Sequence, residues 1–261
     1  MSLLAANIFW KARLKASAIH LGISLSLAVL AALLVFYVWY PYPYREISGG
    51  RELFLIVVAV DVVMGPLMTL AVFNINKSRN ELRRDLAVIG LLQVVALAYG
   101  LWTVAVARPV HLVFEIDRFR VVHAIEIPAE LLTRAPPPLQ RLPLSGPTLL
   151  AVREFRDNKE SFEATMAALQ GAVLGARPDF WQAYEQAKPR VLARARPLAD
   201  LKARFPARMD SIDKSLAATN ASGRTADSVG YIPMVGRNSF WTVLIDIQTA
   251  EVIAFVPLDS F

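Results

Sequence analysis

The chain has 261 residues, of which 55% are hydrophobic, and it carries a formal net charge of +6 and no cysteine. The absence of cysteine excludes disulfide bonds, thiolate catalysis and cysteine-ligated metal sites. Residues 1–108 hold 10 basic and 5 acidic side chains, whereas residues 109–261 hold 18 and 17. The positive charge thus accompanies the apolar part of the chain, where basic residues set membrane topology. We therefore expect no nucleic-acid partner.

Three long apolar stretches predict membrane-spanning helices near residues 19–40, 53–73 and 86–106. As a helix, the first stretch would be about 33 Å long, enough to cross the hydrocarbon core of a bilayer. An aromatic and proline cluster follows it instead of a signal-peptidase site, so we expect an uncleaved anchor. The predicted fold is a membrane module with three transmembrane helices at 1–108, followed by one extracytoplasmic α+β domain at 109–261.

The two short loops between the predicted helices differ in charge. Residues 41–52 carry two basic and two acidic side chains, whereas residues 74–85 carry four basic and two acidic ones. Because lysine and arginine concentrate in cytoplasmic loops, the basic N-terminus and the second loop are expected in the cytoplasm. The third helix then exits outward. This predicts a multi-pass protein of a bacterial inner membrane, in contact with its lipids, with the C-terminal domain in the periplasm.

Polar side chains inside the predicted spans are the candidate contact sites, because an ionisable group in a membrane helix normally faces the bundle or a partner. Counting 1.5 Å per residue from the outer ends predicts an outer pair of Asp61 and Tyr99. The same count predicts an inner group of Gln93, Thr69, Ser24 and Ser26. Three roles are considered: cohesion within the bundle, contact with a foreign helix, and proton translocation, for which one acid is a poor pathway. The candidate polar or partner contacts are Asp61, Tyr99, Gln93, Thr69 and Pro66.

The C-terminal domain is predicted to contain antiparallel strands at its two ends. Alternating and β-branched residues at 110–127 predict an opening hairpin. The apolar segments 240–247 and 251–258 flank a polar turn and predict a closing hairpin, whose strands are expected to join the opening pair. A further short strand is expected at 149–154, after a proline-rich loop at 135–147.

Short helices are expected between these strands. A capping pattern begins at Asn158, and apolar residues follow it at helical spacing. Four prolines then divide the next stretch into short helices, and each is expected in a first turn, where proline is best tolerated. These prolines are Pro178, Pro189, Pro197 and Pro206.

Motifs for catalysis are absent from the sequence: it contains no GxSxG, HExxH, phosphate-binding loop or dinucleotide fingerprint. We therefore expect no enzyme activity and no cofactor. His111 and His123 lie in neighbouring strands of the opening hairpin and could form part of a metal site, but no third ligand is near, so no metal is expected. His20 lies at the start of the first predicted span, where an interfacial role is expected.

Two charged groups of the C-terminal domain have alternative interpretations. Glu115 and Asp117 share a strand face, as an acid–base pair would, but they border a turn beside two arginines, which favours a solvated hairpin end. A run of basic residues is interpreted either as an ordinary solvent-exposed surface or as a binding patch for anionic lipid headgroups or an acidic partner. That run comprises Lys188, Arg190, Arg194, Arg196, Lys202, Arg204 and Arg208.

Five ordered strings carry a family resemblance: WKARLKASAIHL, YPYPYREISGGRELFLI, VDVVMGPLMTLAVFN, DLAVIGLLQVVALAYG and ARPVHLVFEIDRF. They resemble the type IV pilin accessory proteins of the TfpX/TfpZ family, over about the first 125 residues, and the closing FWTVLIDIQTAEVIAFVPL does so more weakly. The resemblance implies a non-enzymatic, chaperone-like inner-membrane protein that keeps a type IV major pilin stable and assembly-competent. It supplies no catalytic residues, and residues 129–228 match no quotable pattern.

Small residues in the predicted spans are expected to let a pilin helix approach closely, namely Gly65, Gly90 and Gly100. Two other classes of function compete with this one. A membrane-anchored extracytoplasmic sensor or ligand-binding protein fits the layout, but the cytoplasmic segments are short for an output module. An enzyme that modifies pilin lacks a convergent acid, metal or phosphate site here. The oligomeric state stays open, with a homo-oligomer among the partners considered.

Overall fold

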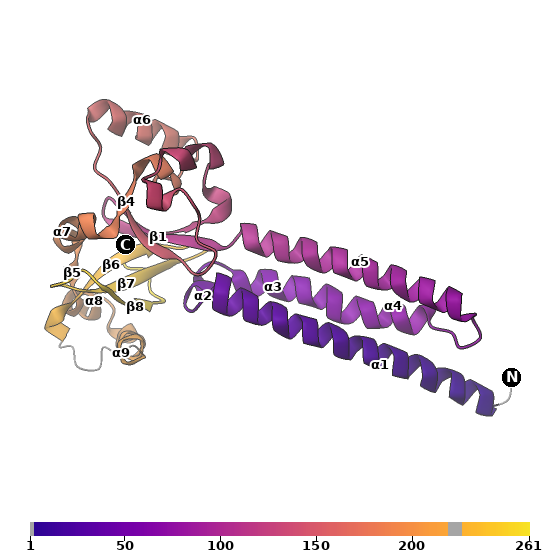
Figure 1. The fold of residues 1–261 in the computed structure, drawn as a ribbon. Coiled ribbons are helices and arrows are strands. Elements are labelled where there is room, and N and C mark those ends of the chain that lie inside the picture. Colours follow the sequence, from indigo (N-terminus) through magenta and orange to yellow (C-terminus); the bar gives the residue numbers. More distant parts are fainter. Residues whose placement is uncertain (1–2, 219–225) are drawn as a thin grey trace. The chain divides into compact units, whose positions relative to one another are not determined.

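The computed structural model describes residues 3–218 and 226–261, which form two compact units (Figure 1). The first unit contains the chain up to Val38 together with Gly50–Val106. The second contains Ala107–Phe261 and also Trp39–Gly49, although residues 39–49 are expected in the membrane module from their position in the sequence. The short helix α2 (Tyr44–Ile47) places this segment in the second unit, because Tyr44 and Ile47 are buried in the hydrophobic core of that unit.

The first unit consists of three long helical segments. The first is α1 (Leu3–Leu33) with its π-helical continuation η1 (Leu34–Trp39). The second runs through α3 (Gly50–Ala59), the π-helical η2 (Val60–Met64) and α4 (Gly65–Val72), and the third is α5 (Arg79–Val106). Within the described residues, three helices are long and apolar enough to cross a membrane, at Asn7–Trp39, Gly50–Val72 and Arg79–Val106. The prediction of three long apolar helices is confirmed.

The middle segment lies between α1 and α5 and packs against both (Figure 1). Its C-terminal end is held by two basic side chains, one from α1 and one from the loop that precedes α5. Arg13 donates from Nε to the carbonyl of Phe73 at 2.7 Å, and Lys77 donates from Nζ to the carbonyl of Val72 at 3.3 Å. Positive groups at a helix C-terminus bind its unpaired carbonyls and interact favourably with its dipole. Arg13 therefore connects the start of α1 to the end of α4.

The second unit is built on one mixed β-sheet. Seven strands follow the order β4-β3-β1-β2-β6-β7-β8, and β5 (Arg196–Pro197) pairs with β6. The opening hairpin is confirmed as β1 (Pro109–Glu115) and β2 (Arg118–His123), and the closing hairpin as β7 (Phe240–Asp246) and β8 (Val252–Val256). The predicted short strand is confirmed as β3 (Thr148–Val152), and β4 (Trp181–Ala183) forms the far edge.

The expected antiparallel strands form only part of the sheet, which is mixed. β1 pairs in parallel with β3, and β2 pairs in parallel with β6 (Val229–Val235). The closing hairpin therefore does not join the opening pair directly, because β6 lies between them. β6 was not predicted, since Gly230 and Pro233 interrupt its apolar run and its residues are buried on both faces, which removes the alternation typical of a half-buried strand.

Helices occur between these strands in the sequence. They are α6 (Asn158–Leu169), α7 (Tyr184–Arg194), α8 (Leu198–Arg204) and α9 (Met209–Ala217). The start of α6 agrees with the predicted capping pattern, although the cap itself is Asp157, whose side chain accepts from the backbone N–H of Glu160 at 2.7 Å. Short 3-10 turns occupy η3 (Ala124–Glu126), η4 (Ala129–Arg134), η5 (Pro137–Leu139), η6 (Leu174–Ala176), η7 (Pro178–Phe180), η8 (Pro206–Arg208) and η9 (Ala226–Ser228).

Three of the four singled-out prolines stand at helix starts as predicted. Pro178 and Pro206 open 3-10 turns, and Pro197 immediately precedes α8. Pro189 is the exception, because it lies inside α7 beyond the first turn. Tyr184 and Val191 of α7 are buried in the core, and this packing maintains the helix across the proline.

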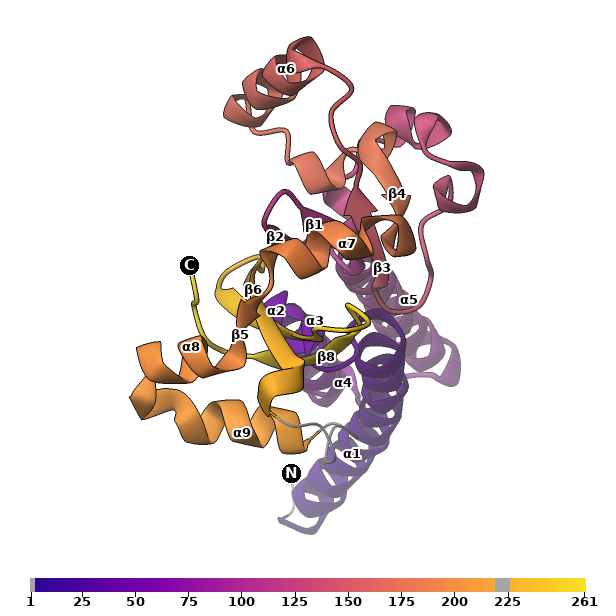
Figure 2. The ribbon, with the colours of Figure 1, turned by 90° about the vertical axis from the view of Figure 1, so that its left-hand side faces the viewer.

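The core of the second unit lies on both faces of the sheet. On one face Leu112 and Phe114 of β1 pack with Tyr184 and Val191 of α7, and Figure 2 shows α7 lying across these strands. On the other face Val113 of β1 belongs to a cluster with Trp181 and the 3-10 turns. A third cluster joins α8 and α9 to β6, β7 and β8.

Candidate functional site

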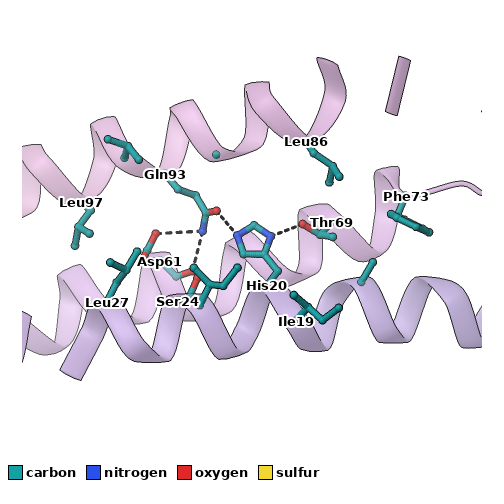
Figure 3. Close-up of a pocket in the computed structure, with 14 residues that line it drawn as sticks. Ile19, His20, Ser24, Leu27, Asp61, Thr69, Phe73, Leu86, Gln93 and Leu97 are labelled. Carbon is teal, nitrogen blue, oxygen red and sulfur yellow. Dashed lines mark hydrogen bonds between the residues drawn. The ribbon is translucent and has the colours of Figure 1, made fainter. Parts of the chain in front are cut away.

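Polar side chains of the first unit meet in a continuous chain of hydrogen bonds that links its three helical segments (Figure 3). Nδ1 of His20 on α1 lies 2.5 Å from Oγ1 of Thr69 on α4, and Nε2 lies 2.5 Å from Oε1 of Gln93 on α5. The amide nitrogen of Gln93 donates to Oδ1 and to the backbone carbonyl of Asp61, both at 3.1 Å. Four polar residues thus form hydrogen bonds with one another between apolar helices, where unpaired polar groups are costly.

The surroundings of Gln93 determine the direction of these hydrogen bonds. Its amide nitrogen faces two oxygens of Asp61, and a flipped amide would place oxygen against oxygen. Oε1 of Gln93 therefore faces His20, whose Nε2 must carry a hydrogen to donate to it. In a neutral imidazole Nδ1 then accepts from the hydroxyl of Thr69. Thr69 thus donates to His20, His20 donates to Gln93, and Gln93 donates to the carboxylate of Asp61.

The backbone around Asp61 explains why its carbonyl is available. Asp61 lies in the π-helical segment η2, in which a carbonyl pairs with the N–H five residues ahead. For Asp61 that residue is Pro66, which has no N–H. The open carbonyl accepts from Gln93 instead. Pro66 therefore acts on the site through the backbone group that it leaves unpaired, while its own carbonyl accepts from Oγ of Ser17 at 2.9 Å.

Glycines give this site its close packing. A Cβ atom at Gly65 would lie 1.9 Å from Nε2 of Gln93, and one at Gly100 would lie 2.6 Å from Cγ1 of Val57. These two glycines therefore serve contacts within the chain, which corrects the expectation that they receive a foreign helix. A Cβ at Gly90 would meet no atom within 4 Å, so of the three predicted positions only Gly90 leaves room for a side chain.

The predicted outer pair and inner group of polar residues do not match the observed hydrogen bonds. Asp61 bonds to Gln93 and not to Tyr99, which is 68% exposed and contacts the ring of Trp102. His20, expected at the membrane interface, belongs to the network, because α1 begins at Leu3 and places His20 well inside the helix. Ser24 is buried beside the network, whereas Ser26 is exposed and bonds within its own helix. A contact between these residues and a partner stays a prediction.

A pocket of about 490 Å³, here called the helix groove, borders the network (Figure 3). Its polar lining is the network itself with Ser24. The remaining lining is apolar and comes from α1, α5 and the end of the middle segment: Ala16, Ile19, Ile23, Leu27, Phe73, Leu86, Gly90, Val94 and Leu97. The groove is thus an apolar surface whose floor holds a carboxylate and an imidazole.

A second pocket of about 310 Å³ lies between the middle segment and α5 and includes Tyr99 and Gly100. Asp61 and Leu97 line both pockets. Asp61 therefore separates two apolar spaces within the first unit. This position makes Asp61 the central residue of the candidate site.

In the second unit Glu115 has a structural position. It is buried, lies 2.6 Å from Nε of Arg120 through Oε1, and accepts from the backbone N–H of Gly175 at 2.9 Å through Oε2. Asp117 is partly exposed and pairs with Arg118 at 2.7 Å. The expectation of a solvated hairpin end therefore holds for Asp117 but not for Glu115, which joins the hairpin to η6.

The two histidines of the hairpin lie in separate environments. His111 packs edge-on against Trp181 and its Nδ1 lies 2.7 Å from Oγ1 of Thr148, whereas His123 pairs with Glu126. Burial lowers the pKa of His111 to about 4, so this side chain is neutral at pH 7. Within the described part of the chain, no group of three or more histidine, aspartate or glutamate side chains is placed to hold a metal ion.

Several side chains of the basic run in the second unit make contacts within the protein. Lys188 pairs with Glu185 and Lys202 with Asp213, both at 2.6 Å. Arg190 donates to the carbonyl of Val152 at 2.5 Å. These contacts reduce the number of cations available to a lipid or an acidic partner.

Comparison with known proteins identifies the family. A family model described as "Fimbrial assembly protein FimB" matches residues 8–49. Over 95% of both chains, the protein is 34% identical to "Fimbrial assembly protein, serogroup I" of Dichelobacter nodosus and 32% identical to the serogroup E1 protein of that organism. The protein of serogroups C1 and C2 is 40% identical over 46% of this chain and 92% of its own length. No solved structure matches.

These findings confirm the resemblance carried by the membrane-helix strings. Relatives more than 30% identical extend along nearly the whole sequence, so the match covers both units. The chain belongs to the family of fimbrial assembly proteins, accessory proteins of type IV pilus assembly.

Proposed function

We propose that this protein is an inner-membrane accessory protein that stabilises a type IV pilin before the pilin enters the pilus. The family supports a role in pilus assembly, and its relatives are named for fimbrial assembly. The observation that carries the proposal is the helix groove with Asp61 in its floor, because a pilin awaiting assembly is an apolar helix in need of a partner. The protein acts by binding and performs no catalysis.

The proposed topology places the N-terminus in the cytoplasm and residues 109–261 in the periplasm. The charge contrast between residues 41–52 and 74–85 supports this arrangement. In this topology the helices lie in the membrane and the folded domain lies in the periplasm. The helix and the globular domain of a pilin occupy the same two places. A reporter that is active only outside the cytoplasm, fused after Phe261, is expected to be active. Activity of a cytoplasmic reporter at that position would overturn the topology.

The proposed function is tested by deleting the gene and measuring the neighbouring pilin. We expect a lower steady-state level of pilin at an unchanged transcript level, with partial restoration when a periplasmic protease is also removed. The intact mass of the remaining pilin separates a binding protein from an enzyme, because a lost modification would indicate catalysis. Normal pilin half-life and normal surface pili in the deletion strain would overturn the proposal.

A further inference from the structure

The walls of the helix groove keep exposed apolar surface. Ile19, Ile23 and Leu27 on α1 are 57%, 56% and 40% exposed, and Val94 on α5 is 62% exposed, although all four line the groove. Exposed apolar side chains are ordinary on helices that face lipid. Their arrangement around a buried carboxylate is not ordinary, because charged groups are costly in a bilayer.

Asp61 lines the helix groove, and its carboxylate has unused acceptor capacity. Its Oδ1 accepts from Gln93, whereas Oδ2 accepts no hydrogen bond from any residue that the structure describes. Oδ2 is not one of the fully buried side-chain atoms that lack a hydrogen-bond partner. It therefore keeps some accessible surface through which a donor can reach it. An ionised carboxylate offers about four acceptor positions, and donors directed at it form stronger hydrogen bonds than neutral pairs do.

We infer that the helix groove is the docking site of the transmembrane helix of the pilin, and that this helix directs a hydrogen-bond donor at Asp61. The identity of the partner rests on the function proposed above, whereas the site rests on the geometry. A lipid chain would fill the apolar walls but would bring no donor to the carboxylate. A helix can bring both apolar side chains and a donor.

The length of the groove suits a helix. Its lining extends from Ala16 to Leu27 on α1 and from Leu86 to Leu97 on α5, about 16 Å along each helix. This length equals three helical turns, which is enough for a row of side chains at i, i+4 and i+7 to lie between α1 and α5. The α1 and α5 helices both pack on the middle segment, which leaves the space between them for such a row.

The occupant can be identified by photocrosslinking in the intact membrane. A photoreactive amino acid in place of Ile23 would lie in the groove. Leu25 is the control position, because it is also exposed but lies two residues further along α1 and therefore points to the opposite side of the helix. We expect crosslinks to the pilin from Ile23 and not from Leu25. A crosslink from Ile23 to a second copy of this chain, or to lipid alone, would overturn the inference.

Blocking the groove tests its role. Gly90→Leu places a side chain where a Cβ meets no atom within 4 Å, so the bundle can fold while the groove is filled. Gly22→Leu makes the same change at another open position that does not line the groove. We expect Gly90→Leu to abolish the Ile23 crosslink and to lower the pilin level at normal abundance of this protein. Gly22→Leu should retain both.

The charge is tested by Asp61→Asn, which keeps an acceptor for Gln93 but removes the negative charge. We expect roughly fivefold less pilin to copurify, the difference between a charged and a neutral hydrogen bond. Unchanged copurification in Asp61→Asn and in Gly90→Leu, with a deletion strain that still loses pilin, would overturn the groove and retain the proposed function. Crosslinking to pilin from Ile23 in a strain background where deletion leaves the pilin level unchanged would support the groove and overturn the stabilising role.

Discussion

His20 and Gln93 are 73 residues apart in the sequence, and Nε2 of His20 lies 2.5 Å from Oε1 of Gln93. This contact joins α1 to α5 across the middle helical segment. Because Gln93 also binds both the side chain and the backbone of Asp61, the position of its amide controls the whole network. Changes that move Gln93 should therefore affect the stability of the first unit.

Gly65→Ala is expected to move Gln93 and to destabilise the helical bundle. The added Cβ would lie 1.9 Å from Nε2 of Gln93, so the amide must leave Asp61. Interhelical hydrogen bonds in membranes contribute about 1 kcal/mol each, which sets the expected loss at roughly 1–2 kcal/mol. Unfolding of the full chain in mixed detergent micelles measures it. Gly22→Ala, with open space around its Cβ, is the matched control and should not be destabilised.

Asp61→Asn is expected to be milder than Asp61→Leu for the stability of the protein itself. Asparagine keeps an oxygen that can accept from Gln93, whereas leucine leaves the Gln93 amide with the Asp61 backbone carbonyl alone. The difference should be on the order of 1 kcal/mol and should appear as lower abundance and lower resistance to unfolding of the leucine variant. Equal stability of the two variants would show that the side-chain hydrogen bond does not hold the bundle together.

The apolar helices and the two hairpins could be predicted because their signals are local. A long uncharged stretch or an alternating pattern beside a turn is read from neighbouring residues alone. The hydrogen-bond partners in the bundle could not be predicted in this way. A rise of 1.5 Å per residue gives the depth of a side chain along its helix. Which residue it bonds to also depends on the direction in which the side chain points around the helix axis. The π-helical segment η2 changes that direction between Ala59 and Gly65.

Long-range pairings in the second unit were missed for a related reason. The parallel pairing of β2 with β6 joins residues more than 100 positions apart, and β6 has no alternating pattern to reveal it. Tyr44 and Ile47 were assigned to the membrane part by position in the chain, although their burial belongs to the other core. Asp61 could be singled out from the sequence because the cost of a carboxylate inside a membrane helix does not depend on knowing its partner, and its contact with a partner stays a prediction.

The stability of the second unit is expected to fall as the pH is lowered from 6.5 toward 4. Burial lowers the pKa of His111 to about 4, whereas an unfolded histidine has a pKa near 6.5. Between these values the unfolded chain binds a proton that the folded chain does not, so acid favours unfolding. The full effect corresponds to roughly 3 kcal/mol.

Thermal unfolding followed by tryptophan fluorescence at pH 7.5, 6 and 5 measures this effect, since Trp181 packs against His111. In His111→Gln the side chain does not titrate, so the decline over this pH range should become shallower. The same slope in His111→Gln and in the unmodified protein would show that His111 does not cause the decline.

Glu115→Ala is expected to destabilise the second unit by roughly 2–4 kcal/mol. The change removes the partner of Arg120 and the acceptor of the Gly175 N–H, and breaking a buried ion pair leaves uncompensated polar groups. Asp117→Ala is the matched control on the same hairpin, because Asp117 is partly exposed and its replacement should cost less than about 1 kcal/mol. Chemical denaturation measures both variants. Equal effects would contradict the buried role of Glu115.

Exchange of residues 129–228 with the same segment of a relative is expected to change which pilin is protected, provided that the core is retained. Trp181, Tyr184 and Val191 lie within this range and pack against strands outside it, so these side chains must be kept. The range also presents an exposed apolar face on α6, where Phe162, Met166 and Leu169 are 65%, 41% and 77% exposed. Residues at this spacing lie on one side of a helix, and exposed apolar groups of this kind are typical of contact surfaces.

The exchange is measured by coexpression with each of the two pilins and by the half-life of each pilin. Protection should follow the origin of residues 129–228, because a helix groove that accepts an apolar helix discriminates little between pilins, whereas the folded domains of different pilins present different surfaces. A control exchange of residues 1–108 should leave the preference unchanged. Preference that follows residues 1–108 would instead place client selection in the helical bundle and make Asp61 and the groove walls its determinants.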